Sequence, residues 1–128
     1  MRFSFWEDFM KANILGTQYR VLFKNYNDDP LFEERGIDGY HDFISKEIVV
    51  CRKKTSPMWE KETEEYCKTA EKEILRHEVI HAFLSESGLD ASSYIYNNGW
   101  AKNEEMVDFF ALQFPKIVEV FEKLDCLR

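Results

Sequence analysis

The sequence is poor in cysteine, and the few cysteines do not form a recognisable framework. There are three, Cys51, Cys67 and Cys126, which is an odd number, and no Cys-x-x-Cys pair occurs. Free thiols in a reducing cytoplasm fit this usage. We expect the cysteines to behave as small core residues.

Long apolar runs are also missing. No stretch approaches the roughly 18 residues that a membrane span needs. The stretch Met1–Asp8 has neither an uninterrupted apolar core nor a small-residue cleavage site. We therefore expect no secretory signal and no membrane partner.

Positive charge is in short supply. Lysine and arginine number 17 against 24 aspartates and glutamates, and the formal net charge is −7. An acidic chain repels phosphate backbones, so nucleic acid is not expected as a partner. The local basic run 52–54 is most simply a solvated strand end.

Repeats and low-complexity segments are absent too, and 128 residues suit a single domain over 1–128. Apolar residues make up 45% and aromatic residues 16% of the chain, which favours a packed core over disorder.

The first half of the chain predicts a small, largely antiparallel sheet of three strands. One strand is expected over 13–25, and a hairpin with arms near 38–43 and 47–52. Residues 1–12 suggest a short helix or an aromatic lid. Pro30 is placed to start a short helix that ends near Arg35 and Gly36.

The second half predicts helices. A long helix is expected over 63–87, with Gly88 placed to stop it. A loop over 89–100 precedes a second helix that starts at 101 or 103. Pro115 should end or kink this helix, and an amphipathic helix follows over 116–124. The fold class is therefore α+β.

The long helix carries His77-Glu78-Val79-Ile80-His81. Residues i and i+4 lie on one helical face, so the two histidines can bind one zinc ion. Glu78 would project beside the metal and reach a water as a general base. The alternative is a solvated helix with two surface histidines and a salt-bridged glutamate.

A catalytic zinc site usually has three protein ligands. The second helix opens with Asn103-Glu104-Glu105, and Asp108 lies four residues after Glu104. Glu104 could bind zinc while Asp108 accepts the Nδ1–H of a ligating histidine, for which His77 is favoured. Glu105 stays open as the third ligand, although its i+4 residue is Phe109, which belongs to the core stripe.

The combination His77-Glu78-x-x-His81 followed by Asn103-Glu104-x-x-x-Asp108 resembles the gluzincin metallopeptidases. Val107 stands where that pattern has serine. The length resembles minimal gluzincins and the small ImmA/IrrE-like proteases, and residues 75–89 resemble metallopeptidase-like proteins of phages and mobile elements. The resemblance covers roughly residues 38–121. It implies a zincin-like fold in which the sheet packs on the motif helix and on a following ligand-bearing helix.

The function expected is a zinc-dependent metallopeptidase that acts on a protein or peptide substrate, with Zn²⁺ as cofactor and Glu78 as general base. Tyr94, Tyr96 and His41 are candidates for steadying the oxyanion, and a structural role is the simpler reading of each. A substrate could pair with an edge strand such as 47–52. The alternative function is a zinc-stabilised interaction module with little or no proteolysis. The sequence does not indicate an oligomeric state.

Overall fold

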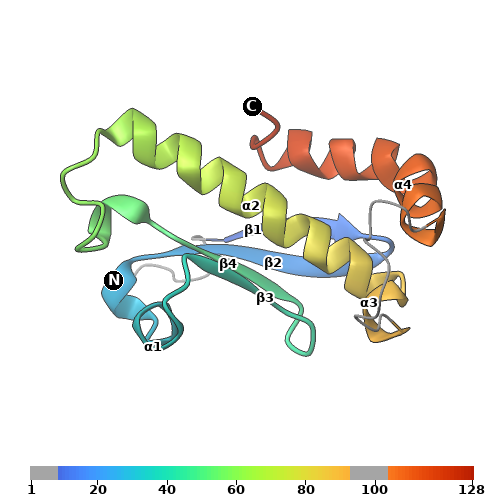
Figure 1. Cartoon of the computed structure of the whole chain (residues 1–128), viewed down its shortest axis with the longest axis horizontal. Helices are drawn as coiled ribbons and strands as arrows, with labels where there is room; N and C mark the ends of the chain where they lie inside the picture. The colour runs from blue at the N-terminus through green and yellow to red at the C-terminus, as the bar shows by residue number, and fades with distance from the viewer. Residues whose placement is uncertain (1–8, 93–103) are drawn as a thin grey trace.

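A four-stranded mixed sheet lies at the centre of the computed structural model, which describes residues 9–92 and 104–128 (Figure 1). The strand order is β1-β2-β4-β3, and β2 and β4 run parallel while the other two pairs are antiparallel. The strands are β1 (Phe9–Ile14), β2 (Thr17–Lys24), β3 (Gly39–Asp42) and β4 (Glu47–Cys51).

The α+β class is confirmed, but the expected number of three strands is wrong: the sheet has four, and it contains one parallel pair beside two antiparallel ones. A two-residue turn at Leu15 and Gly16 divides the chain where one strand over 13–25 was expected, and residues 9–12 belong to β1. The φ angles of Leu15 and Gly16 are 51° and 93°, and hairpin turns of this kind need two positive values. The Asn13 side chain supports the turn by accepting a 2.7 Å hydrogen bond from the Gly16 amide.

The hairpin of β3 and β4 is confirmed, with Gly39 opposite Val50 and Asp42 opposite Glu47. The suggestion that 47–52 forms an edge strand is wrong, because β4 pairs with β2 on one side and β3 on the other. Within the described residues, the sheet edges are β1 and β3.

The helices follow the expected order. They are α1 (Leu31–Arg35), α2 (Glu64–Glu86), α3 (Leu89–Ser92) and α4 (Glu104–Lys123), with short 3-10 turns η2 (Tyr26–Asp28) and η3 (Lys53–Thr55). Thr63 caps α2 by accepting a 3.1 Å hydrogen bond from the Tyr66 amide. Gly88 follows α2 with a φ of 86°, so it stops the helix as expected.

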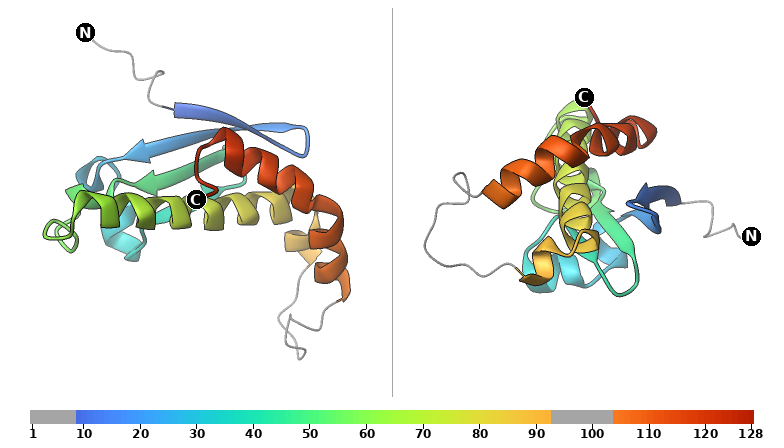
Figure 2. Two further views of the ribbon diagram at one scale, coloured as in Figure 1. Left: turned by 90° about the horizontal axis from the view of Figure 1, so that it is seen from above. Right: turned by 90° about the vertical axis from the view of Figure 1, so that its right-hand side faces the viewer.

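Two corrections concern the later helices. The short helix α3 occupies the start of the segment 89–100 that was expected to be a loop. Helix α4 is continuous across Pro115 and bends partway along its length, so a kink rather than an end is what the structure shows (Figure 2). No helix in the described ranges is long and apolar enough to cross a membrane.

The core lies between one face of the sheet and the helices α2 and α4. The strands supply alternating buried residues such as Tyr19, Val21, Ile48 and Val50. The helices supply Leu75, Val79, Ala82, Phe83, Phe109, Ile117, Val120 and Phe121. A smaller cluster on the other face joins Val49 and Cys51 to Phe32 of α1. The period-2 alternation of β4 therefore assigns its residues to two layers, and α2 is held along the sheet (Figures 1 and 2).

Candidate metal centre

His77 and His81 lie together on the exposed face of α2. Their Nε2 atoms are 3.1 Å apart, and the ring centroids are 4.7 Å apart with planes at 72°. Two nitrogens held by one tetrahedral zinc at about 2.0–2.1 Å would be roughly 3.3 Å apart. The pair therefore has the spacing of two zinc ligands. The same distance also suits a hydrogen bond between two neutral imidazoles.

Glu78 projects toward the sheet and not toward solvent. It is 9% exposed and lies beneath the start of β3, where a Cβ added to Gly39 would be 3.7 Å from the Glu78 Cγ. Burial raises the pKa of the Glu78 carboxyl, and the neighbouring His77 and His81 partly oppose this. The carboxyl is thus sheltered beside the histidine pair.

His41, the remaining one of the three histidines in the chain, lies on β3 close to His81. Its ring is nearly parallel to the His81 ring at 7° with 6.4 Å between centroids, and the Tyr19 ring lies 6.1 Å away on another side. The His41 Nε2 atom is buried without a hydrogen-bond partner in the described structure. Burial, followed by the nearby His81, lowers the pKa of His41.

The proximity of His41 follows from strand alternation. Gly39 and His41 are two residues apart on β3, so both face α2, whereas Tyr40 faces the other layer. The sequence named His41 only as one of three oxyanion candidates. The predicted hairpin already placed His41 on a strand. Its position over the motif depends on how β3 packs against α2, which the local sequence does not indicate.

The other expected site residues cannot be placed beside the histidine pair. Glu104 begins α4 and Asp108 lies on its second turn, but their side chains fall outside the described residues. Tyr94 and Tyr96 also lie outside them. Glu105 is described and exposed, and Phe109 is buried in the core. Among the side chains that are described, no three His, Cys, Asp or Glu groups come close enough to hold a metal ion.

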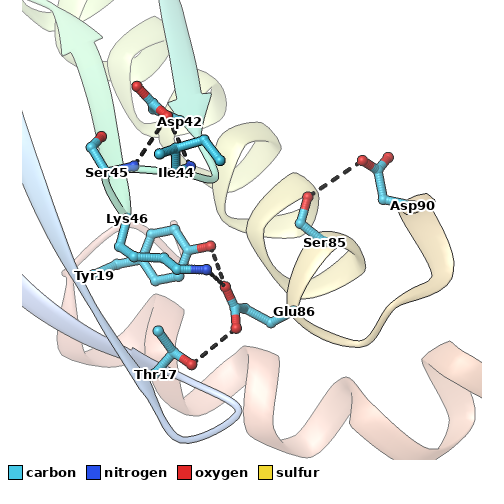
Figure 3. A network of polar contacts seen from close by, with 9 residues as sticks. All are labelled: Thr17, Tyr19, Asp42, Ile44, Ser45, Lys46, Ser85, Glu86 and Asp90. Atoms are coloured by element: carbon cyan, nitrogen blue, oxygen red, sulfur yellow. Dashed lines mark hydrogen bonds and ion pairs between the residues drawn. The ribbon is translucent and has the colours of Figure 1, made fainter.

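A polar network anchors the end of α2 that carries His81. The Glu86 carboxylate accepts hydrogen bonds from Thr17 at 2.9 Å, Tyr19 at 2.7 Å and Lys46 at 2.7 Å (Figure 3). Burial opposes ionisation of Glu86, but these donors outweigh it and lower the pKa of the carboxyl. The two hairpin turns are therefore fastened to the last turn of α2.

A small pocket opens beside the motif. It has a volume of about 260 Å³ and lies between the start of β3 and the middle of α2, with His77 and Glu78 in its wall. Larger hollows of about 700, 710 and 370 Å³ lie elsewhere: along the first half of α2, between α4 and the β1–β2 turn, and at the end of α4. None of these three is lined by the motif residues, so the small pocket is the one that bears on the chemistry.

Comparisons with protein-family models, curated proteins and solved structures found no significant match.

Proposed function

We propose that the protein is a zinc-dependent metallopeptidase. The observation that carries this proposal is the 3.1 Å separation of the His77 and His81 Nε2 atoms with the sheltered Glu78 next to them. A purely structural zinc site has no use for a carboxylate that is not a ligand. The adjacent Glu78 therefore favours hydrolysis over a merely structural role.

His77 and His81 would hold the metal, and Glu104 is the third ligand that the sequence favours. Bound zinc supplies a Lewis acid that makes water a competent nucleophile near neutral pH. Asp108 would orient His77 by accepting its Nδ1–H. These last two assignments rest on the helical spacing of Glu104 and Asp108.

Glu78 is the proton carrier of the proposed reaction. Its carboxylate takes the proton that water loses as the new C–O bond forms at the peptide carbonyl carbon. It then gives this proton to the leaving amine as the C–N bond breaks. His41, whose ring lies beside His81, is the described candidate for a hydrogen bond to the carbonyl oxygen.

The test is a comparison of zinc-loaded wild type with Glu78→Gln on a peptide library read by mass spectrometry. We expect Glu78→Gln to keep its zinc and to cleave about 10²–10⁴-fold more slowly, the usual contribution of a general base. Glu65→Gln is the matched control, because Glu65 is exposed near the start of α2. It should cleave like the wild type.

Zinc content by elemental analysis and the zinc-dependent rise in Tm provide readouts other than activity. Zinc binding with no cleavage that depends on Glu78 would contradict the peptidase proposal. That result would instead favour the zinc-stabilised interaction module.

A further inference from the structure

The pocket beside Glu78 has the size of a site for one side chain. Its volume of about 260 Å³ lies just below the range of roughly 300–1,000 Å³ that is usual for whole small-molecule ligands. Besides His77 and Glu78, its walls are Ile37, Asp38, Gly39, Glu73 and Ile74. The pocket therefore adjoins the proposed reaction centre directly.

Ile37 and Ile74 are the apolar residues of the wall, and β3 approaches α2 closely at Gly39. A Cβ on Gly39 would lie 2.6 Å from the Ile74 Cγ2 and 3.0 Å from the Val49 carbonyl oxygen, so no side chain fits there. Ile37 and Ile74 can contact the aliphatic part of a side chain that enters from the open side.

Two further residues of the wall, Asp38 and Glu73, carry carboxylates. Asp38 is paired with the buried Lys53 at 2.7 Å, which largely neutralises its charge. Glu73 is exposed and lies four residues before His77, hence on the same helical face. Within residues 9–92 and 104–128, no lysine or arginine forms an ion pair with Glu73.

Glu78 adds a second, independent feature. It is about nine-tenths buried and lines the pocket, and its carboxylate forms no hydrogen bond or ion pair with another described residue. Judged by the described residues, the pocket thus combines apolar walls, an exposed carboxylate without an ion-pair partner and a buried carboxylate without a hydrogen-bond partner. A side chain with a long apolar stem and a cationic end matches this arrangement.

The neighbouring sheet edge can bring such a side chain into place. In the described structure β3 pairs only with β4, so its outer edge is open to an added strand. A peptide laid along this edge runs past Gly39, which lines the pocket, and past His41, which lies next to His81. When a peptide adds to a sheet edge as a strand, pockets beside that edge bind its alternate side chains and so provide specificity.

We propose that this pocket takes a lysine or arginine side chain next to the cleaved bond, with Glu73 selecting its charge. The inference rests on the proposed peptidase function and specifies its substrate class as basic peptides. It also makes Glu73 a specificity-determining residue without a part in the chemical step.

The experiment uses the zinc-loaded full chain and peptides that differ at one position, occupied by arginine, lysine, methionine or glutamate. We expect the wild type to prefer the cationic peptides by roughly five- to tenfold in kcat/KM over methionine, the scale of a partly exposed charge pair. Glu73→Gln should lose most of this preference, and Glu73→Lys should shift it toward the glutamate peptide. The preference should weaken as salt rises.

Glu65→Lys is the matched control, because it makes the same charge change on α2 away from the pocket. Selectivity that is the same in wild type, Glu73→Gln and Glu73→Lys would overturn the inference while leaving the peptidase proposal intact. So would a wild-type preference for methionine or glutamate.

A binding measurement distinguishes failure of the pocket assignment from failure of the peptidase proposal. Where the wild type cleaves none of the peptides, fluorescence anisotropy with the zinc-loaded wild type, which keeps both pocket carboxylates, reports the pocket without requiring cleavage. If the arginine peptide then binds more tightly than the methionine peptide and loses this advantage in Glu73→Gln, the pocket assignment stands and the peptidase proposal fails. Equal binding of the two peptides would overturn the pocket assignment.

Discussion

The hydroxyl of Tyr19 on β2 donates a 2.7 Å hydrogen bond to Oε2 of Glu86, in the last turn of α2 (Figure 3). The same Tyr19 ring lies 6.1 Å from His41, which in turn lies beside His81. The bond therefore connects the framework of the sheet to the edge of the proposed metal centre. Because Lys46 and Thr17 also donate to Glu86, one carboxylate joins three segments of the chain.

Glu86→Gln should destabilise the protein by about 1–3 kcal/mol at neutral pH, because charged hydrogen bonds are lost in a partly buried network. The folded state lowers the pKa of Glu86 below its ordinary value of 4.5. The stabilisation is thus fully present above about pH 4.5 and is lost as the pH falls through the folded-state pKa. Urea unfolding of both proteins across this range measures the difference.

The control is Glu122→Gln, an exposed glutamate on α4, which should leave the free energy of unfolding within about 0.5 kcal/mol of wild type. A Glu86→Gln deficit that stayed constant down to low pH would show that the ionised carboxylate is not what stabilises the network.

Replacement of either motif histidine should abolish tight zinc binding. Since each would supply one ligand of the proposed site, His77→Ala and His81→Ala should each weaken zinc binding by more than about 100-fold, beyond the usual loss for an orienting partner. Equilibrium dialysis with elemental analysis gives the zinc content. His41→Gln is the matched histidine control. It should retain zinc, because His41 does not lie close enough to His77 and His81 for the three to hold one metal ion. A loss of zinc in His41→Gln equal to that in His77→Ala would place His41 among the ligands.

Gly39→Ala should destabilise the protein by about 1–3 kcal/mol through overpacking. The added methyl would lie 2.6 Å from the Ile74 Cγ2, so the Ile74 side chain or the spacing between β3 and α2 would have to change. Ile74→Ala removes that atom and should reduce the cost of Gly39→Ala in a double-mutant cycle measured by chemical unfolding. Strictly additive costs would mean that this contact does not limit the approach of the helix to the strand.

The three cysteines should react slowly with a disulfide reagent in the native protein. All are free and buried, and burial raises the pKa of Cys51 and of Cys126 to about 11 each. Few thiolates are therefore available at mildly alkaline pH. The absorbance of released thiolate follows the reaction, and unfolded protein should titrate three thiols. Rapid reaction of one thiol in the native state would contradict the burial of that cysteine.

Local sequence patterns anticipated the parts of the fold that form over short distances. Thr63 and Gly88 bound the motif helix, and the β-branched run in β4 marks its strand. The turn at Leu15 and Gly16 was missed because Leu-Gly is not a common sequence for a turn with two positive φ angles. The parallel pairing of β2 with β4 was missed because β3 and α1 separate them along the chain.

The spacing of His77 and His81 was enough to predict that they share one helical face, because helix geometry places residues i and i+4 together. The burial of Glu78 beneath β3 and the position of His41 beside His81 come from the packing of β3 against α2. The same packing makes Glu73 part of the wall of a pocket beside the motif. These relationships depend on strand order and on the close approach allowed by Gly39, which follow from packing between distant segments rather than from local periodicity.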